Sequence, residues 1–103
     1  MGKKIIKRLY DLILERKEHP VKDSYTCRLF KTGKDEILKK IGEEAIEVIV
    51  ASKGQTRDRL ISEIADLIYH TLVLMAEEGI KPEDVYAELE SRFGESGLKA
   101  PSN

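Results

Sequence analysis

The sequence predicts an all-α fold, a bundle of four to five helices, and three observations support this prediction. Apolar residues recur at the three-and-four spacing of a helix face along almost the whole chain. The seven Gly and three Pro residues fall mostly near the ends of these periodic segments. Period-two alternation is never sustained, so no β-sheet is expected. The 103 residues are expected to form one domain over residues 1–94, followed by a flexible tail at 95–103.

The first helix is predicted to end near residue 17, because the dipeptide at 19–20 contains a helix-breaking Pro. Its apolar face consists of Ile5, Ile6, Leu9, Leu12 and Ile13. A brief second helix is expected to run through Phe30. Ser24 is its predicted N-cap and Gly33 its predicted stop.

Two long central helices follow in the prediction. The first covers residues 35–53 and ends at Gly54. The second begins after the N-cap Thr56 and runs to residue 78, where Gly79 stops it.

The last helix is predicted from Pro82, which suits the first turn of a helix because its missing N–H is not needed there. Val85, Leu89 and Phe93 follow at helical spacing and are expected to point inward. Gly94 is expected to end this helix.

Composition narrows the classes of function. A net charge of -1 gives no electrostatic case for binding nucleic acid or a membrane surface. The apolar runs are too short to span a bilayer, and the basic N-terminus lacks the apolar region of a signal peptide, so a cytoplasmic protein is expected. The single cysteine, Cys27, cannot form an intramolecular disulfide or a thiolate zinc cage, and is interpreted as a small buried thiol.

Each central helix carries a polar strip between apolar arcs when its residues are placed on a wheel at about 100° each. On the first, the strip holds Lys40, Glu43, Glu44 and Glu47. The main apolar arc of that helix consists of Ile37, Leu38, Ile41, Ala45, Val48 and Ile49, with Ile46 and Val50 on the other side. On the second, the strip holds Glu63, Asp66 and His70. Its main arc consists of Leu60, Ile61, Ile64, Leu67, Ile68, Leu72 and Met75, with Tyr69, Val73 and Leu74 outside it.

Acids on such helices are expected to be partly buried, because a helix that is apolar nearly all round is usually covered. Buried carboxylates must be paired, protonated or bound to a cation. Glu44 and Glu47 are three residues apart, as are Glu63 and Asp66, so each pair shares one helix face. Two helices packed side by side would bring the four carboxylates together. An all-oxygen set suits Mg²⁺ or Mn²⁺.

Other interpretations of these residues stay open at this stage. Either acidic motif alone is more often a solvated helix face. His70 on a mostly apolar helix is more often a hydrogen-bonded structural residue than a ligand. A di-iron bundle uses Glu-x-x-His pairs, but the residue three after Glu63 is Asp66.

The acidic motifs resemble the signature of the MazG-type all-α nucleotide pyrophosphohydrolases. Residues 43–47 read Glu-Glu-Ala-Ile-Glu and residues 63–66 read Glu-Ile-Ala-Asp, with 15 residues between them. Further segments resemble one branch of that superfamily, the phosphoribosyl-ATP pyrophosphohydrolases. These segments are residues 24–26, Leu29-Phe30, Gly33, residues 39–45 and residues 65–73. The resemblance covers Ile5 to Phe93, nearly the whole chain.

The resemblance implies an activity, a metal site and an assembly. Phosphoribosyl-ATP would be hydrolysed to phosphoribosyl-AMP and pyrophosphate, the second step of histidine biosynthesis. A Mg²⁺ site would be built from Glu44, Glu47, Glu63 and Asp66. The protein would be a homodimer. It would be the free-standing form, because one cysteine cannot supply the metal ligands of the cyclohydrolase to which this domain is fused in many organisms.

Roles follow from the chemistry of polyphosphate cleavage, which needs charge neutralisation and an aligned water. Glu43 or one of the ligands, Glu44 or Glu47, is the expected proton acceptor. Contacts to phosphate are expected from Lys40, with Lys39 and Arg59 as weaker candidates. His70 is expected either to contact a phosphate or to orient a ligand. Contacts to nucleotide or ribose are expected from Ser24, Tyr25, Thr26 and Phe30, with Phe30 against the adenine.

Two alternative functions remain at the level of sequence: a MazG-type pyrophosphohydrolase of another nucleoside triphosphate, and a non-enzymatic helical dimerisation module. Turnover of a nucleotide panel with Mg²⁺ separates them. The number of metal ions, the phosphorus attacked and the identity of the base stay open. The apolar residues outside the main arcs, Ile46, Val50, Tyr69 and Val73, favour a dimer, because monomers rarely expose such patches.

Overall fold

A computed structural model gives the fold and describes residues 4–94 and 97–98. Five helices account for most of them, which confirms the all-α prediction. They are α1 (Ile5–Glu18), α2 (Tyr25–Thr32), α3 (Lys34–Gly54), α4 (Arg57–Glu78) and α5 (Pro82–Ser91). Two short strands follow, β1 (Phe93–Gly94) and β2 (Gly97–Leu98). Within the described ranges, no helix is both long enough and apolar enough to cross a membrane.

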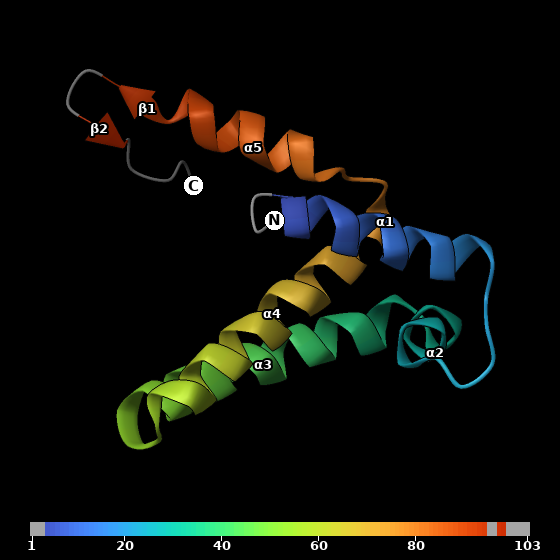
Figure 1. Ribbon diagram of the computed structural model, residues 1–103, viewed down its shortest axis with the longest axis horizontal. Coiled ribbons are helices and arrows are strands. Elements are labelled where there is room, and N and C mark those ends of the chain that lie inside the picture. Colours follow the sequence, from blue (N-terminus) through green and yellow to red (C-terminus); the bar gives the residue numbers. More distant parts are fainter. Residues whose placement is uncertain (1–3, 95–96, 99–103) are drawn as a thin grey trace.

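The two longest helices, α3 and α4, form an antiparallel hairpin that makes the most extensive packing in the chain (Figure 1). Helices α1 and α2 pack at one end of this hairpin, and α5 turns back along α1. The other end of the hairpin projects away from the remaining helices (Figure 1). The chain therefore has an open, forked shape, with principal extents of 49 × 34 × 32 Å.

Local side-chain and backbone chemistry sets the helix ends much as predicted. The Ser24 hydroxyl accepts a hydrogen bond from the Cys27 N–H at 3.2 Å and caps α2. Thr56 caps α4 in the same way, accepting from the Arg59 N–H at 3.2 Å. Gly79 ends α4 in the left-handed conformation, with φ of 72°, which costs glycine little.

The core lies where α1, α2, the start of α3 and the end of α4 meet. Its buried residues are Tyr10, Ile13, Leu29, Ile37, Leu72, Val73, Met75 and Ala76. All of them lie at the α1–α2 end of the hairpin, and in its projecting half the buried apolar residue is Ala51, on α3. The stability of the folded chain therefore depends mainly on one compact cluster at one end of the hairpin.

The predicted inward face of α5 is wrong. Val85, Leu89 and Phe93 are 38%, 47% and 64% exposed. The reason is that α5 contacts the rest of the chain mainly through α1, and Pro82 is the residue of α5 that is buried. The helix also ends at Ser91, not at Gly94.

The expectation of no sheet is also wrong, although only locally. Phe93 pairs with Leu98 and Gly94 with Gly97 in an antiparallel ladder. The predicted flexible tail at 95–103 therefore contains β2 at residues 97–98. Residues 95–96 and 99–103 lie outside the described part of the structure.

Two of the apolar residues that were expected to be uncovered are covered by the chain itself. Val73 is fully buried and Tyr69 is half-buried, because α2 packs over this part of α4. Ile46 and Val50 behave as expected, with 60% and 45% of their surface exposed.

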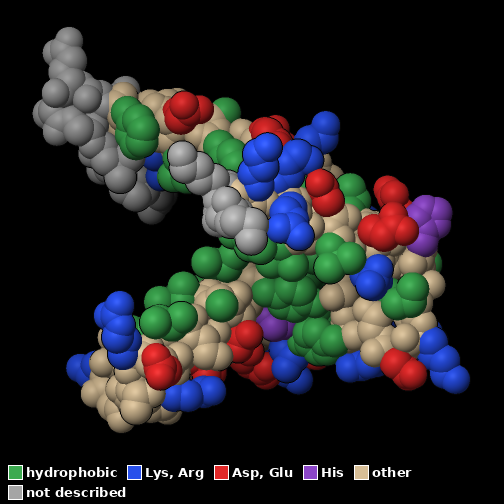
Figure 2. All heavy atoms as spheres, viewed as in Figure 1, with side chains coloured by type: hydrophobic (Ala, Val, Ile, Leu, Met, Phe, Trp, Pro, Cys, Tyr) green, Lys and Arg blue, Asp and Glu red, His purple; other side chains and the backbone are tan. Residues whose placement is uncertain are grey.

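Several residues of the predicted main arcs on the hairpin are exposed as well. Together they form a set that we call the exposed hairpin residues: Leu38, Ile46, Ile49, Val50, Ile61, Ile64 and Ile68. Hydrophobic side chains gather along the projecting hairpin in Figure 2. A single chain therefore leaves much of the apolar surface of its two longest helices open to solvent.

Ile13→Ala tests the position of the core. Ile13 is 1% exposed, so removing its side chain should leave a cavity and lower the free energy of unfolding by about 2–5 kcal/mol. Leu12→Ala, at a neighbouring position that is 49% exposed, is the control and should cost below about 1 kcal/mol. Urea denaturation followed by circular dichroism measures both. Equal losses in the two variants would contradict the burial pattern.

Candidate active site

Three carboxylates from the two central helices meet at one place on the hairpin. Glu44 on α3 and Glu63 and Asp66 on α4 have carboxylate oxygens that all lie within 4.8 Å of one another. We call these residues the acid cluster. Glu63 is buried, Glu44 is half-buried and Asp66 is exposed, so the cluster opens to solvent on one side. The predicted meeting of the two acidic strips holds for these three residues.

Glu47 does not join this group. It follows Glu44 by about one turn of α3, and its side chain is exposed. The predicted convergence of four carboxylates is therefore wrong by one residue, and a role for Glu47 as a ligand stays a prediction. Glu43 is also exposed and pairs with Lys40 at 3.5 Å, on the outer side of the strip.

Burial and like charge both act on the acid cluster. Burial, and then the neighbouring Asp66 and Glu63 carboxylates, raise the pKa of Glu44 above its ordinary value of 4.5. Glu63, whose side chain is 5% exposed, forms an ion pair with the far more exposed Arg59, one turn earlier on α4. One arginine against three carboxylates leaves an excess of negative charge, and oxygen donors in this arrangement fit a hard divalent cation.

His70 is hydrogen-bonded to the backbone that carries one member of the acid cluster. Its Nδ1 lies 2.8 Å from the backbone carbonyl oxygen of Asp66, and its Nε2 lies 2.8 Å from the hydroxyl of Tyr25. Because a carbonyl can only accept, Nδ1 carries a proton, and in the neutral ring Nε2 accepts from the Tyr25 O–H. His70 is 5% exposed and both ring nitrogens are occupied. This arrangement fits the interpretation of His70 as a hydrogen-bonded structural residue, and its contact with Asp66 fits the expectation that it orients a ligand. A contact between His70 and a phosphate stays a prediction.

An aromatic group connects α2 to the acid cluster. The rings of Tyr25 and Tyr69 lie 5.7 Å and 4.9 Å from that of His70, each nearly perpendicular to it. The Tyr69 hydroxyl also forms a short hydrogen bond with Thr26. Sequence reasoning placed Tyr25 and Thr26 near the substrate but missed Tyr69. The sequence feature that could have indicated Tyr69 is its position three residues after Asp66, because residues at this spacing share a helix face.

The remaining predicted residues are dispersed. Lys39 is exposed on α3, away from the group of three acids. Ser24 is occupied as the cap of α2, and Phe30 packs against the core on another side of that helix. The structure thus gathers Glu44, Glu63, Asp66, Arg59 and the Tyr25–His70 pair, and leaves Lys39 and Phe30 apart from them.

Comparison with known proteins identifies the family. The family model described as phosphoribosyl-ATP pyrophosphohydrolase matches residues 6–93. The chain belongs to this family. It is therefore an enzyme, a hydrolase, and the resemblance drawn from the acidic motifs is confirmed. The match also decides against the di-iron bundle and the non-enzymatic module.

Individual relatives agree with the family match over nearly the full chain. The chain is 54% identical over 93 residues to the phosphoribosyl-ATP pyrophosphatase of Sulfurisphaera tokodaii, covering 90% of this chain and 99% of that protein. It is 50% identical over 98 residues to the protein of the same name from Geotalea daltonii, covering 95% and 92%. A histidine biosynthesis bifunctional protein of Thermoanaerobacter pseudethanolicus is 54% identical over 85 residues, but these make up only 39% of its length.

Glu44→Gln tests the repulsion within the acid cluster. A raised folded-state pKa means that the folded protein holds this proton more tightly than the unfolded chain. The contribution of Glu44 to stability is therefore present below the unfolded pKa and is lost as pH rises through the folded pKa. At pH 7 with chelator, the variant should be at least as stable as the wild type, and stability should fall less as pH rises above 4.5.

Thermal melts across this pH range measure the effect. Glu15→Gln, on the exposed surface of α1, is the matched control and should follow the wild-type curve. A Glu44→Gln protein that melts well below the wild type in chelator would show that the Glu44 charge is a structural contact and not a source of repulsion.

Proposed function

We propose that the protein hydrolyses phosphoribosyl-ATP to phosphoribosyl-AMP and pyrophosphate, a step of histidine biosynthesis in the cytoplasm. The observation that carries this proposal is the acid cluster, because polyphosphate cleavage depends on positioned charge more than on covalent chemistry. The names of the relatives supply the substrate. The family match covers both helices that build the cluster.

Glu44, Glu63 and Asp66 fit as ligands of Mg²⁺ or Mn²⁺, since their oxygens come within 4.8 Å of one another and carry excess negative charge. When bound, such a cation supplies the positive charge that phosphate oxygens need and acidifies the attacking water. Glu47 is a further candidate ligand, because it stands about one turn beyond Glu44 on α3.

We assign roles to the remaining side chains from their positions near the acid cluster. Glu43 and Glu47 are exposed carboxylates beside the cluster, and either can accept the proton of the attacking water. Lys40, 3.5 Å from Glu43, is placed to contact a phosphate. Arg59 neutralises Glu63 and becomes available to phosphate once another cation does so. The Tyr25–His70 pair holds the Asp66 turn in place through the backbone carbonyl.

A second copy of the chain belongs to the proposal. The exposed hairpin residues are branched aliphatic side chains and one Leu, and their contiguous exposure would be unusual for a monomer. A homodimer in which the hairpins of two chains pack together would cover them. The interface would be core-like, on the order of 2,000 Å² or more in total. It would also bring a second chain close to each acid cluster.

Metal dependence and Asp66→Asn test the reaction. Pyrophosphate release from phosphoribosyl-ATP should require Mg²⁺ or Mn²⁺ and stop with chelator. Asp66→Asn keeps the volume of the side chain but removes its charge, so activity should fall by about 100-fold or more. Glu90→Gln, an exposed acid on α5, is the control and should keep full activity.

The same assay on a nucleotide panel tests substrate choice. Phosphoribosyl-ATP should be turned over in clear preference to ATP, dUTP and other triphosphates. Undiminished activity in metal-free buffer would remove the metal site, and preference for another triphosphate would remove the assignment of the substrate.

Val50→Glu tests the dimer. Val50 is 45% exposed on the hairpin, so a charge there should cost little in a monomer but should disrupt a packed interface. We expect the variant to dissociate or unfold. Val21→Glu, at a position with the same 45% exposure in the α1–α2 link, is the control and should remain dimeric. Sedimentation at micromolar concentration separates the outcomes, and a compact, active wild-type monomer would defeat the proposal.

A further inference from the structure

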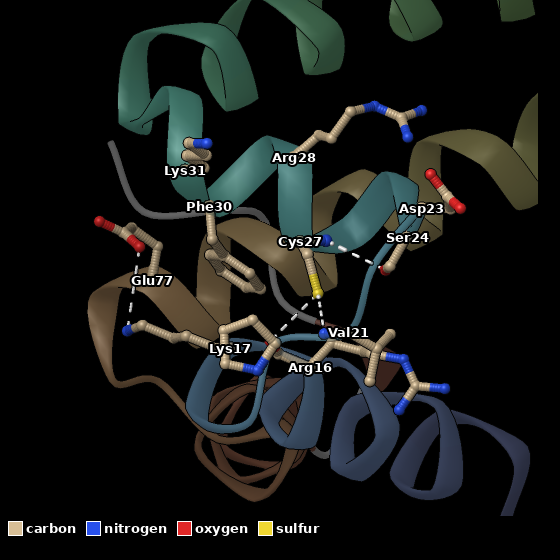
Figure 3. A pocket seen from close by; sticks show the side chains of 11 residues that line it. Arg16, Lys17, Val21, Asp23, Ser24, Cys27, Arg28, Phe30, Lys31 and Glu77 are labelled. Atoms are coloured by element: carbon tan, nitrogen blue, oxygen red, sulfur yellow. Dashed lines mark hydrogen bonds and ion pairs between the residues drawn. The ribbon is translucent and has the colours of Figure 1, made fainter.

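A separate pocket lies between the end of α1, the link that follows it, and α2 (Figure 3). Its volume is about 510 Å³, within the size range of small-molecule sites. The lining residues are Arg16, Lys17, Pro20, Val21, Asp23, Ser24, Cys27, Arg28, Phe30, Lys31 and Glu77. We call this the α1–α2 pocket. None of the three acids of the acid cluster lines this pocket, so the pocket and the acid cluster are separate sites.

The pocket is positively charged in a chain whose net charge is -1. Four of its lining residues are cations and two are acids. Lys17 is already occupied, since its Nζ lies 3.1 Å from the Ala76 carbonyl oxygen and 3.8 Å from Glu77. Among the described residues, Arg16, Arg28 and Lys31 have no carboxylate within ion-pair distance. Unpaired guanidinium and ammonium groups beside a cavity suit a phosphate.

Part of the pocket wall is apolar. The Phe30 ring and the Cys27 thiol point from α2 toward the link, where Val21 lies opposite them (Figure 3). The Cys27 thiol is held there by contacts of 3.3 Å to the Arg16 carbonyl and 3.4 Å from the Val21 N–H. An aromatic ring beside aliphatic side chains is a surface on which a flat heterocycle packs well. The pocket therefore combines an apolar surface that suits a heterocyclic ring with cations that suit a phosphate.

Arg28 connects this pocket to the acid cluster. It lines the pocket, and its side chain extends away from Cys27 (Figure 3). Its guanidinium lies 5.6 Å from the centre of the Tyr25 ring. The Tyr25 hydroxyl bonds to His70, which bonds to the backbone of Asp66. A molecule that runs along α2, from Phe30 near its C-terminal end to Tyr25 at its N-terminal end, can therefore meet both sites.

The chemistry of the substrate requires two such sites. Phosphoribosyl-ATP carries its triphosphate on one ribose and a single phosphate on another, and the purine joins the two riboses. The acid cluster is negative and, with a cation, suits the triphosphate. It offers nothing to the second phosphate, which needs unpaired cations elsewhere.

We propose that the α1–α2 pocket binds the phosphoribosyl-purine end of the substrate, with the purine against Phe30 and Val21. The phosphate lies on a cation that lines the pocket, Arg16 on α1 or Lys31 on α2, which are on opposite sides of it (Figure 3). This inference rests on the proposed function for the identity of the ligand. Arg28 spans the distance between the pocket and Tyr25. ATP shares the purine but lacks the second, singly phosphorylated ribose, so a pocket that holds this ribose phosphate as well favours phosphoribosyl-ATP over ATP.

Direct binding tests the pocket without any turnover. AMP is the probe, and chelator is present so that no metal can hold its phosphate at the acid cluster. Calorimetry should show binding that weakens by about tenfold or more in the double variant Arg16→Gln/Lys31→Gln, because this variant removes the charge-assisted contact on either side of the pocket. Lys53→Gln, at the projecting end of α3, should bind AMP like the wild type. Adenosine, which lacks the phosphate, should bind more weakly than AMP.

Cys27 reports where AMP binds, because it is the only cysteine. Hydrogen bonding with Ser24, and to a lesser degree the Val21 N–H and the Arg16 charge, lowers the pKa of the thiol and favours its reaction with methyl methanethiosulfonate. Saturating AMP should slow this labelling in the wild type and in Lys53→Gln. Binding of AMP with no slowing of labelling, or no binding at all, would overturn the pocket assignment.

Kinetics then separate this inference from the proposed function. The double variant should raise KM for phosphoribosyl-ATP by about tenfold or more with little change in kcat, as for contacts made equally in ground and transition states. AMP should compete with the substrate. If the wild type does not hydrolyse phosphoribosyl-ATP while AMP still protects Cys27, the proposed function fails and the pocket stands as a nucleotide site. If hydrolysis is normal and the double variant leaves KM unchanged, the pocket assignment fails alone.

Discussion

The antiparallel packing of α3 against α4 is the constraint on which the rest of the structure depends. It brings Glu44, Glu63 and Asp66 together, although their mutual repulsion and partial burial oppose the contact. One exposed arginine, Arg59, offsets part of this cost. The remainder is offset by the core, which lies at one end of the same two helices. The site therefore holds carboxylates that repel one another, and the proposed divalent cation would relieve this repulsion.

Helix α2 is short, but it contacts both the core and the part of α4 that lies next to the acid cluster. One side of it places Leu29 in the buried cluster, and another side presents Tyr25 and Thr26 to α4. The Tyr25–His70 hydrogen bond continues to the backbone of Asp66, so the turn that carries this acid is fixed by contacts outside the acid cluster. Buried polar groups that are fully hydrogen-bonded in this way give a site rigidity that solvated side chains do not.

The forked shape of the chain explains why so much apolar surface stays open. In the described residues, the buried cluster draws on α1, α2 and one end of the hairpin, whereas residues such as Ile49 and Ile61 are more than half exposed. A domain of this size has little surface with which to cover two long helices. The proposed second copy would cover them, and this would account for the apolar pattern of α3 and α4. The same openness leaves the pocket between α1 and α2 accessible beside the site.

The sequence by itself determined the helices, most of their ends and the pairing of acids on two faces, because these features depend on local chemistry and on the period of 3.6 residues. The sequence also indicated the family, because the motifs that identify it are short stretches of neighbouring residues. Only the tertiary structure decided that Glu47 stands apart, that His70 is buried with both nitrogens occupied, and that α5 leaves Leu89 exposed. Periodicity tells which residues share a face, but what covers that face depends on the angle at which distant segments pack. The α1–α2 pocket, assembled from α1, α2 and Glu77, is a product of that packing.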